Sequence, residues 1–304
     1  MKLHKNKGRF VEAITATSAM FGIEPALVEK DYFVTLLLRK AVERIPGLVF
    51  KGGTSLSKCY NLIDRFSEDI DLTLDDEHFT QSKKRNSIIE LITICEELGL
   101  ELTNKEAIEN HTHGNFNCYD ISYPIIFPSE DVKSGLKVEM TYIQKCYPHE
   151  QAVATSYIGE FFAKNGNERV VAEYELNAFT VQVQSLERTL VDKVFAICDY
   201  YLSGNTVRNS RHIYDISKLL TKVDISACNL KSLVENVRKD RKPNKTCVSA
   251  QDGVIISELL GQIVSTEFFK QDYNETTLRL LTKTVYYDEA IKSLQVIIDS
   301  GLFD

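Results

Sequence analysis

Two aspartates one residue apart, Asp69 and Asp71, lie in the stretch "DIDLTL", in which polar and apolar residues alternate. In an extended strand, residues i and i+2 project to the same side, roughly 6–7 Å apart along the backbone. Carboxylates at this spacing can converge on a hard cation such as Mg²⁺, which prefers oxygen ligands and keeps water or phosphate in its other positions. The pattern predicts a site for Mg²⁺, or alternatively Mn²⁺. An isolated Asp-x-Asp pair is also typical of an ordinary exposed strand face.

A glycine-rich turn precedes these aspartates. The apolar segment "GLVF" predicts a short strand that stops at "GGTS", after which "SLSKCYNLI" resumes helical spacing. Free N–H groups and the dipole at the start of a helix favour a phosphate, and glycines let the backbone approach it closely. The spacing differs from that of a Walker phosphate loop. The residues expected to bind the phosphates of a nucleoside triphosphate are Gly52, Gly53, Thr54 and Ser55.

Two lysines are further candidates for phosphate contacts. Lys58 lies at the end of the "GGTSLSK" segment, and Lys30 lies in the preceding helical segment. Lysine side chains at such positions are also commonly solvated. The sequence leaves both interpretations open.

A third carboxylate for the metal is expected from a neighbouring strand. In "LKVEMTY" the apolar residues alternate with Lys137, Glu139 and Thr141, so Glu139 is the candidate metal ligand. Glutamate is also common on the solvated face of a strand, and that alternative stays open.

The surrounding elements predict an α+β fold. Helices are expected at 24–44 and 82–98, and strands at 118–127 and 136–142. After residue 184 the pattern becomes almost wholly helical, which indicates a mixed α/β domain at 1–184 and a helical C-terminal domain at 185–304. The helical segments expected in the second domain lie near 185–203, 209–222, 229–238, 249–264 and 288–299.

Composition limits the partners and the compartment. The 304 residues are 43% hydrophobic and carry a net charge of −7, so no domain-wide basic field is available to hold a long nucleic acid. The chain contains no run of eighteen apolar residues, and its seven cysteines form no C-x-x-C pair. We expect a cytoplasmic protein with reduced thiols and no membrane partner. The pair His111 and His113, in a loop rich in Asn and Gly, is not expected to bind metal.

Four segments together resemble the AbiEii/AbiGii toxin family of nucleotidyltransferases. They are "LVEKDYFVTLLL", "FKGGTSLSKCYNLIDRFSEDIDL", "LKVEMTY" and "RTLVDKVFAICDYYLSGNTVRNSRHIYDISKLL", in the order of the family and spanning residues 28–220. The resemblance implies a DNA polymerase β-like nucleotidyltransferase fold, with a mixed sheet, flanking helices and a helical second domain that completes the active-site cleft. It also implies a role in toxin–antitoxin systems and in abortive infection against phage, with a cognate antitoxin as partner.

The resemblance assigns roles to individual residues. Gly53 and Ser55 would bind phosphate, Asp69 and Asp71 would bind metal, and Lys193 and Asp215 would belong to the catalytic residues of the C-terminal half. The chain departs from the family at His212, three residues before Asp215, where the family often has an acid. A second acid from that helix is therefore in doubt.

In the helix expected at 185–203, Lys193 lies in an otherwise apolar row, between Leu190 and Ile197. Such a lysine either extends its stem past the edge of the core or directs its ammonium at a triphosphate. Asp215 has Arg211 four residues earlier, so it forms a surface ion pair or positions a lysine.

The function expected from these features is metal-dependent transfer of a nucleotidyl group from a nucleoside triphosphate to RNA, with the tRNA 3′ end as a candidate acceptor. Some members of the family act on that end. The alternatives are transfer to a protein or a small molecule, or a non-catalytic module that keeps the fold for binding. Retention of Asp69, Asp71 and Glu139 favours an enzyme.

Overall fold

The computed structural model describes residues 2–67, 69–75, 80–110, 114–130, 132–142 and 145–304. The chain divides into two compact units, and each is described by itself. The sheet unit consists of Met1–Cys59 and Ser67–Val183, and the helical unit consists of Tyr60–Phe66 and Gln184–Asp304. The histidine pair at 111 and 113 lies outside the described residues.

The sheet unit has the α+β architecture expected from the sequence. Its mixed sheet has seven strands in the order β3-β4-β5-β2-β1-β7-β6. The strands are β1 (Leu48–Lys51), β2 (Asp69–Leu74), β3 (Glu101–Leu102), β4 (Phe116–Ser122), β5 (Leu136–Thr141), β6 (His149–Ala154) and β7 (Phe179–Gln184). The helices are η1 (Leu3–Lys5), α1 (Lys7–Phe21), α2 (Pro25–Arg44), α3 (Gly52–Lys58), α4 (Gln81–Leu98), α5 (Lys105–Asn110), α6 (Tyr157–Lys164) and α7 (Glu168–Glu173).

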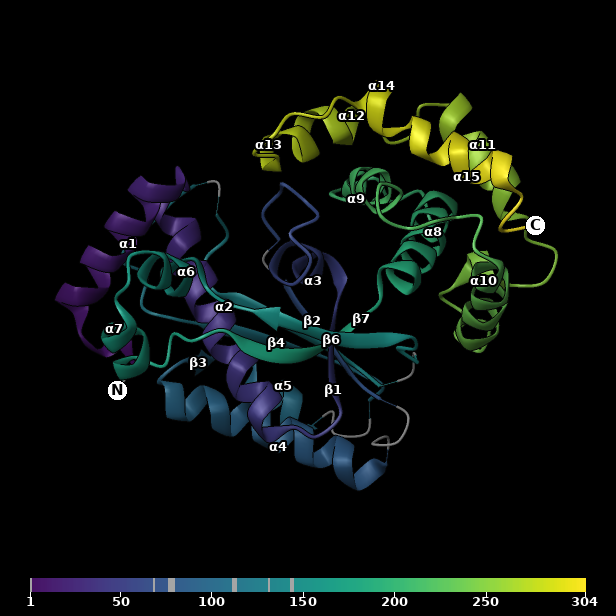
Figure 1. The fold of residues 1–304 in the computed structure, drawn as a ribbon. Helices are drawn as coiled ribbons and strands as arrows, with labels where there is room; N and C mark the ends of the chain where they lie inside the picture. Colours follow the sequence, from purple (N-terminus) through teal and green to yellow (C-terminus); the bar gives the residue numbers. More distant parts are fainter. Residues whose placement is uncertain (1, 68, 76–79, 111–113, 131, 143–144) are drawn as a thin grey trace. The chain divides into compact units, whose positions relative to one another are not determined.

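Both edges of β2 are paired, and this pairing determines which side chains lie beside its aspartates. β2 runs antiparallel to β1 and parallel to β5. β5 in turn pairs with β4 in the antiparallel direction. The central strands β4, β5, β2 and β1 therefore lie side by side. Figure 1 draws the fold and labels β1, β2 and β4 among the strands of this sheet.

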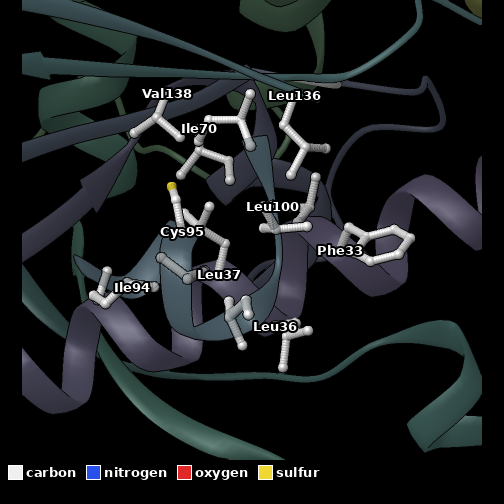
Figure 2. Packing of buried hydrophobic residues seen from close by; sticks show 14 of the residues in the cluster. Phe33, Leu36, Leu37, Ile70, Ile94, Cys95, Leu100, Leu136 and Val138 are labelled. Atoms are coloured by element: carbon white, nitrogen blue, oxygen red, sulfur yellow. The ribbon is translucent and has the colours of Figure 1, made fainter. Parts of the chain in front are cut away.

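The core of the sheet unit fixes the orientation of β2. Ile70 of β2 and Val138 of β5 are fully buried against Leu37 of α2 and Ile94 of α4 (Figure 2). Because successive side chains of a strand point to opposite faces, burial of Ile70 directs Asp69 and Asp71 to the face away from this core. Helix α2 is buried along most of its length.

Several boundaries in the sheet unit differ from the sequence-based predictions. The predicted strand at 118–127 is instead Phe116–Ser122, because Pro124 has no N–H for a strand ladder. The predicted helical spacing of "SLSKCYNLI" continues only to Lys58, and the helix begins at Gly52. The helix predicted at 24–44 is confirmed as Pro25–Arg44.

The helical unit is built around α8. Its helices are α8 (Leu186–Leu202), α9 (Arg211–Leu219), α10 (Cys228–Arg241), η3 (Val248–Ala250), α11 (Ile256–Ser265), α12 (Lys270–Asp272), η4 (Tyr273–Thr277), α13 (Leu278–Leu280), α14 (Tyr287–Ala290) and α15 (Lys292–Ser300). The helix predicted at 249–264 begins only at Ile256, because Gly253 forms a turn with φ of 78° before it. The short helices between 270 and 280 were not predicted.

The segment Tyr60–Phe66 belongs to the helical unit although it lies between two elements of the sheet unit in sequence. The N–H of Asp64 donates to the Tyr214 hydroxyl of α9 at 2.9 Å, and Arg65 forms a β-bridge with Leu281. The segment therefore packs against α9 and the chain near Leu281 within the helical unit.

Within the described residues, no single helix is both long enough and apolar enough to span a membrane. α1 and α2 meet those criteria only as a pair joined by a bend of 113°.

The packing around Ile94 (Figure 2) predicts that truncation of two isoleucines of α4 should lower the free energy of unfolding by very different amounts. Ile94 is fully buried, whereas Ile89 in the same helix is 49% exposed. Replacing Ile94 by Ala should lower the free energy of unfolding by about 2–5 kcal/mol, because it leaves a cavity. The matched change Ile89→Ala should stay within about 0.5 kcal/mol. Urea denaturation of both variants checks this, and equal losses would contradict the assigned core.

Candidate active site

The polar face of β2 carries the two aspartates beside the polar face of β5. The strand register places Asp71 opposite Glu139 and Asp69 opposite Lys137. Paired residues of neighbouring strands lie on the same face, so Asp69, Asp71 and Glu139 share one side of the sheet. All three are partly exposed, whereas Ile70 and Val138 between them are buried. The expectation that Glu139 comes from a strand next to the aspartates is confirmed.

The Asp71 carboxylate lies against the backbone of Gly52, the first residue of α3. Gly52 has φ of 76°, and a Cβ built on it would overlap Asp71 Oδ2 and lie 2.7 Å from Asp71 Cγ. Only glycine fits this position, both for its backbone conformation and for the approach of the carboxylate. One of the candidate metal ligands is thus in contact with the candidate phosphate-binding turn.

The hydroxyls of Thr54 and Ser55 hold the turn in place. Thr54 Oγ1 donates to Ser67 Oγ at 3.0 Å and to the backbone carbonyl of Asp69. Ser55 Oγ donates to the carbonyl of Gly52 at 2.8 Å. Both side chains are buried, as is Gly53. A phosphate at this turn would therefore be met by the backbone N–H groups that the start of a helix leaves unpaired. The Thr54 hydroxyl fixes the turn to β2, and the Ser55 hydroxyl bonds within the turn.

Of the two interpretations left open for Lys58, the solvated one is wrong, and the phosphate contact stays a prediction. Lys58 Nζ binds Asp31 Oδ1 at 2.5 Å and the carbonyl of Thr155 at 3.1 Å, and its side chain is only 7% exposed. Asp31 also accepts a hydrogen bond from the N–H of Tyr157. The lysine therefore links α3 to α2 and to the chain before α6. Lys30 is likewise buried, and its Nζ donates to the carbonyl of Lys133 at 2.8 Å.

Glu139 forms an ion pair with Lys137 on its own strand. The hydrogen bond that the Lys137 ammonium donates to the Glu139 carboxylate raises the pKa of Lys137, so the lysine is cationic. Among the described residues, no three acidic, histidine or cysteine side chains form a complete metal cluster. Asp69 and Asp71 still offer a pair of oxygen donors, which suits Mg²⁺ because this ion is commonly held by one or two carboxylates together with substrate phosphates.

A pocket of about 420 Å³ opens beside Asp69. Asp120 of β4 and Lys137 of β5 line it, together with Lys30 and Lys133. Asp120 lies opposite Lys137 in the register, so a row of alternating charge, Asp120, Lys137 and Asp69, crosses three strands. The sequence did not predict that Asp120 and Lys137 lie at the site. The alternation of "NCYDIS" could have placed Asp120 on a polar face, but only the strand order places it near Asp69.

In the helical unit, Lys193 and Asp215 are bonded to each other and buried. Lys193 Nζ lies 2.6 Å from Asp215 Oδ2, and Asp215 is fully buried. The interpretation of Asp215 as a surface partner of Arg211 is wrong, because its arginine partner is Arg65, which binds both carboxylate oxygens at 2.7 Å. Burial opposes the charged form of Asp215, but Arg65 and Lys193 hold its pKa well below the usual range.

Comparison with known proteins identifies the family of this chain. The sequence matches the family described as "Nucleotidyl transferase AbiEii toxin, Type IV TA system" over residues 35–293. The chain belongs to this family of toxin nucleotidyltransferases, whose members use nucleoside triphosphates and divalent metal and are paired with an antitoxin.

A solved structure supports the fold. The nucleotidyltransferase toxin MenT4 from Mycobacterium tuberculosis H37Rv is similar, with a TM-score of 0.55 and 16% sequence identity over 92% of this chain and 86% of that chain. A search among curated proteins found no significant match.

The contact between Gly52 and Asp71 predicts a specific defect in metal binding. Gly52→Ala should weaken binding of Mn²⁺ about tenfold or more, because the new Cβ displaces the carboxylate. Gly22→Ala is the matched control, since Gly22 also has positive φ, at 66°, but has nothing within 4 Å of an added Cβ. Both changes should cost about 1–2 kcal/mol of stability from backbone strain. Titration of Mn²⁺ followed by electron paramagnetic resonance measures the difference, and equal affinities in the two variants would argue against this contact as part of a metal site.

The ion pair between Lys137 and Glu139 predicts that removing the lysine should tighten metal binding. Lys137→Met should tighten Mn²⁺ binding about threefold to tenfold, because an ammonium about 6 Å from a dication repels it by about 1 kcal/mol even in water. Lys105→Met is the control, since the Lys105 side chain is also 43% exposed and binds a glutamate, Glu96, in the same unit. The same titration applies. Weaker binding after Lys137→Met would mean that the lysine supports the metal site instead of competing with it.

Proposed function

We propose that this enzyme transfers a nucleotidyl group from a nucleoside triphosphate to a hydroxyl of RNA, with Mg²⁺ held by Asp69 and Asp71. The observation that carries this proposal is the seating of Asp71 against Gly52. It brings a cation-binding carboxylate and a helix start suited to phosphate into contact, and phosphoryl transfer needs both next to each other.

The residues divide the chemistry among them. The N–H groups of the turn Gly52–Ser55 bind the outer phosphates. Asp69 and Asp71 orient the triphosphate for in-line attack, with Glu139 as a third acid on the same face. Bound Mg²⁺ would neutralise phosphate charge and make the acceptor hydroxyl more acidic. An acceptor oxygen forms a bond to the α-phosphorus, the bond to the β-phosphate oxygen breaks, and pyrophosphate and a proton are released.

A short RNA end is the acceptor that the charge distribution favours. The net charge of −7 opposes a long RNA footprint, whereas the pocket beside Asp69 gathers Lys30, Lys133 and Lys137 within one local site. A few phosphates near a terminal hydroxyl suit such a site, and the 3′ end of tRNA has this form. The nucleotide substrates and the RNA are cytoplasmic, so the protein acts there.

Family membership supports a biological role as a toxin. As the toxin of a toxin–antitoxin pair, the enzyme would arrest growth by modifying RNA, and in phage defence it would do so during infection. Its antitoxin would keep the activity low in uninfected cells.

The central test compares Asp71→Asn and Asp69→Asn with the wild type. Each change keeps the side-chain shape but removes a charge needed to hold a dication, so transfer of label from [α-³²P] nucleoside triphosphates to total RNA should fall at least about 100-fold. Asp252→Asn, at a side chain that is 86% exposed, should leave transfer unchanged. Label that appears on protein instead of RNA would show that the acceptor is a protein. A folded Asp71→Asn protein with wild-type transfer would refute the metal-dependent mechanism.

A further inference from the structure

The pocket beside Asp69 and the candidate phosphate-binding turn lie on opposite sides of β2. The turn follows β1, which pairs with one edge of β2, whereas the pocket is lined by residues of β5 and β4, which continue the sheet from the other edge. In phosphoryl transfer the attacking and leaving oxygens lie roughly in line across the phosphorus. With the leaving pyrophosphate at the turn, the attacking hydroxyl therefore approaches from the side on which the pocket lies.

The pocket is small and mixed in character. Its volume of about 420 Å³ is near the lower end of the range for small-ligand pockets, about 300–1,000 Å³. Lys133 and Lys137 bring positive charge to its lining, and Ile125, which is 44% exposed, brings an apolar surface. A ligand with a phosphate, a polar ring and an apolar face suits these groups.

Helix α2 holds one wall of the pocket in place. Glu29 accepts hydrogen bonds from the N–H groups of Ile126 at 2.8 Å and Phe127 at 2.9 Å, shortly after β4 ends. The Lys30 ammonium donates to the Lys133 carbonyl at 2.8 Å, shortly before β5 begins. Glu29 and Lys30 are both buried, and hydrogen bonds are stronger where water is excluded. The wall is therefore formed before a ligand enters.

Asp120 lines this pocket with a carboxylate that keeps free acceptor capacity. Its register partner Lys137 binds Glu139 instead, and within the described part of the chain no lysine or arginine forms an ion pair with Asp120. Asn104 Nδ2 donates to Asp120 Oδ2 at 3.3 Å, and the Cys118 thiol lies 3.9 Å from Oδ1. An ionised carboxylate has about four acceptor sites, so Asp120 can accept further hydrogen bonds from a ligand.

The segment after β3 fixes the backbone of Asp120. Asn104 Oδ1 accepts a hydrogen bond from the Asp120 N–H at 3.1 Å, and Asn104 Nδ2 donates to the Cys118 carbonyl at 2.8 Å. Thr103 donates to the Asp120 carbonyl from its N–H at 2.9 Å and from its hydroxyl at 3.0 Å. Asn104 thus bonds both the backbone and the carboxylate of Asp120, which orients that carboxylate.

We propose that this pocket binds the last nucleotide of the RNA acceptor, and that Asp120, positioned by Asn104, accepts a hydrogen bond from its ribose 2′-hydroxyl. The inference rests on the proposed function in identifying the ligand as an RNA end. Two interstrand spacings, roughly 10 Å, separate the backbones of Asp120 and Asp69. The ribose carries the attacking 3′-hydroxyl and the 2′-hydroxyl side by side, so it spans the space between the two side chains. Because DNA lacks the 2′-hydroxyl, Asp120 is the residue that selects RNA ends.

Binding of two probes, measured by fluorescence anisotropy at a fixed Mg²⁺ concentration without nucleotide, tests this directly. One probe is a short random-sequence RNA labelled at its 5′ end, and the other is the same RNA with a 2′-deoxy nucleotide at its 3′ end. The wild type should bind the first about tenfold more tightly, because the second leaves Asp120 without its donor. Asp120→Ala should bind the two within about twofold of each other. No preference in the wild type, or a tenfold preference in Asp120→Ala, would overturn the proposal.

The ratio of the two affinities separates a hydrogen bond from a general effect of charge. Loss of a carboxylate raises the affinity for both probes alike, since both carry phosphates. Glu101→Ala removes an exposed acid of β3 outside the pocket and should leave the tenfold preference intact. Asp120→Asn keeps the shape and a weaker acceptor, so its preference should be about threefold. If Asp120→Ala does not fold, an undiminished preference in Asp120→Asn would overturn the proposal.

The role of Asn104 is tested with the same ratio. Asn104→Ala keeps every charge in the pocket but frees the Asp120 carboxylate, so the preference should fall to about threefold or less. A merely structural asparagine would lower the stability of the fold and leave the ratio at its wild-type value. That outcome would overturn the positioning role.

Transfer of label to total RNA distinguishes failure of this inference from failure of the proposed function. Transfer by a wild-type protein that shows no preference between the two probes would overturn the subsite and leave the function standing. A preference that depends on Asp120, in a protein that transfers no nucleotide, would support the subsite and refute the function.

Discussion

The close approach of the Asp71 carboxylate to the α-carbon of Gly52 is the constraint on which the candidate active site depends. A carboxylate can rest there only because the residue has no side chain and adopts a positive φ that other residues disfavour. The pairing of β1 with β2 brings the start of α3 to the same level as Asp71, since Lys51 is the register partner of Asp71 and directly precedes Gly52. The candidate phosphate-binding turn and the candidate metal ligand are therefore positioned by the same backbone contact.

The acidic side chains of the two units are paired with cationic side chains in different ways. On the sheet face the acids are partly exposed, and Lys137 engages Glu139 across solvent-accessible space. In the helical unit the charges are buried, and one aspartate is bonded to both an arginine and a lysine. An exposed ion pair is readily exchanged for a metal or a phosphate, whereas a buried one is held by the low polarity around it. The exposed ion pair of the sheet face suits reversible ligand binding, whereas the buried ion pairs of the helical unit keep their charges in fixed positions.

Features that depend on local sequence patterns could be predicted from the sequence. Alternation in "DIDLTL" correctly predicted a strand at Asp69–Leu74 with its aspartates on one face, and alternation in "LKVEMTY" predicted the strand that carries Glu139. Periodicity predicted α2 and α8 to within one residue at each end. The α+β class followed from the change in pattern near residue 184.

Features that depend on contacts distant in sequence were not predictable in this way. Arg65 lies 150 residues from Asp215, so helical spacing pointed to Arg211 instead. Asp31 lies 27 residues from Lys58, and nothing in the local sequence indicated their buried pair. The end of β4 at Ser122 was the exception, because Pro124 was visible in the sequence and its missing N–H should have shortened the predicted strand.

The most direct test of the metal site is anomalous diffraction from crystals grown with Mn²⁺ and a non-hydrolysable nucleoside triphosphate. This account predicts an anomalous peak bonded to carboxylate oxygens of both Asp69 and Asp71, at about 2.1 Å, and to phosphate oxygens of the nucleotide at the turn that begins with Gly52. An ordered nucleotide whose phosphates lie elsewhere, or whose Mn²⁺ ion has neither aspartate as a ligand, would contradict it.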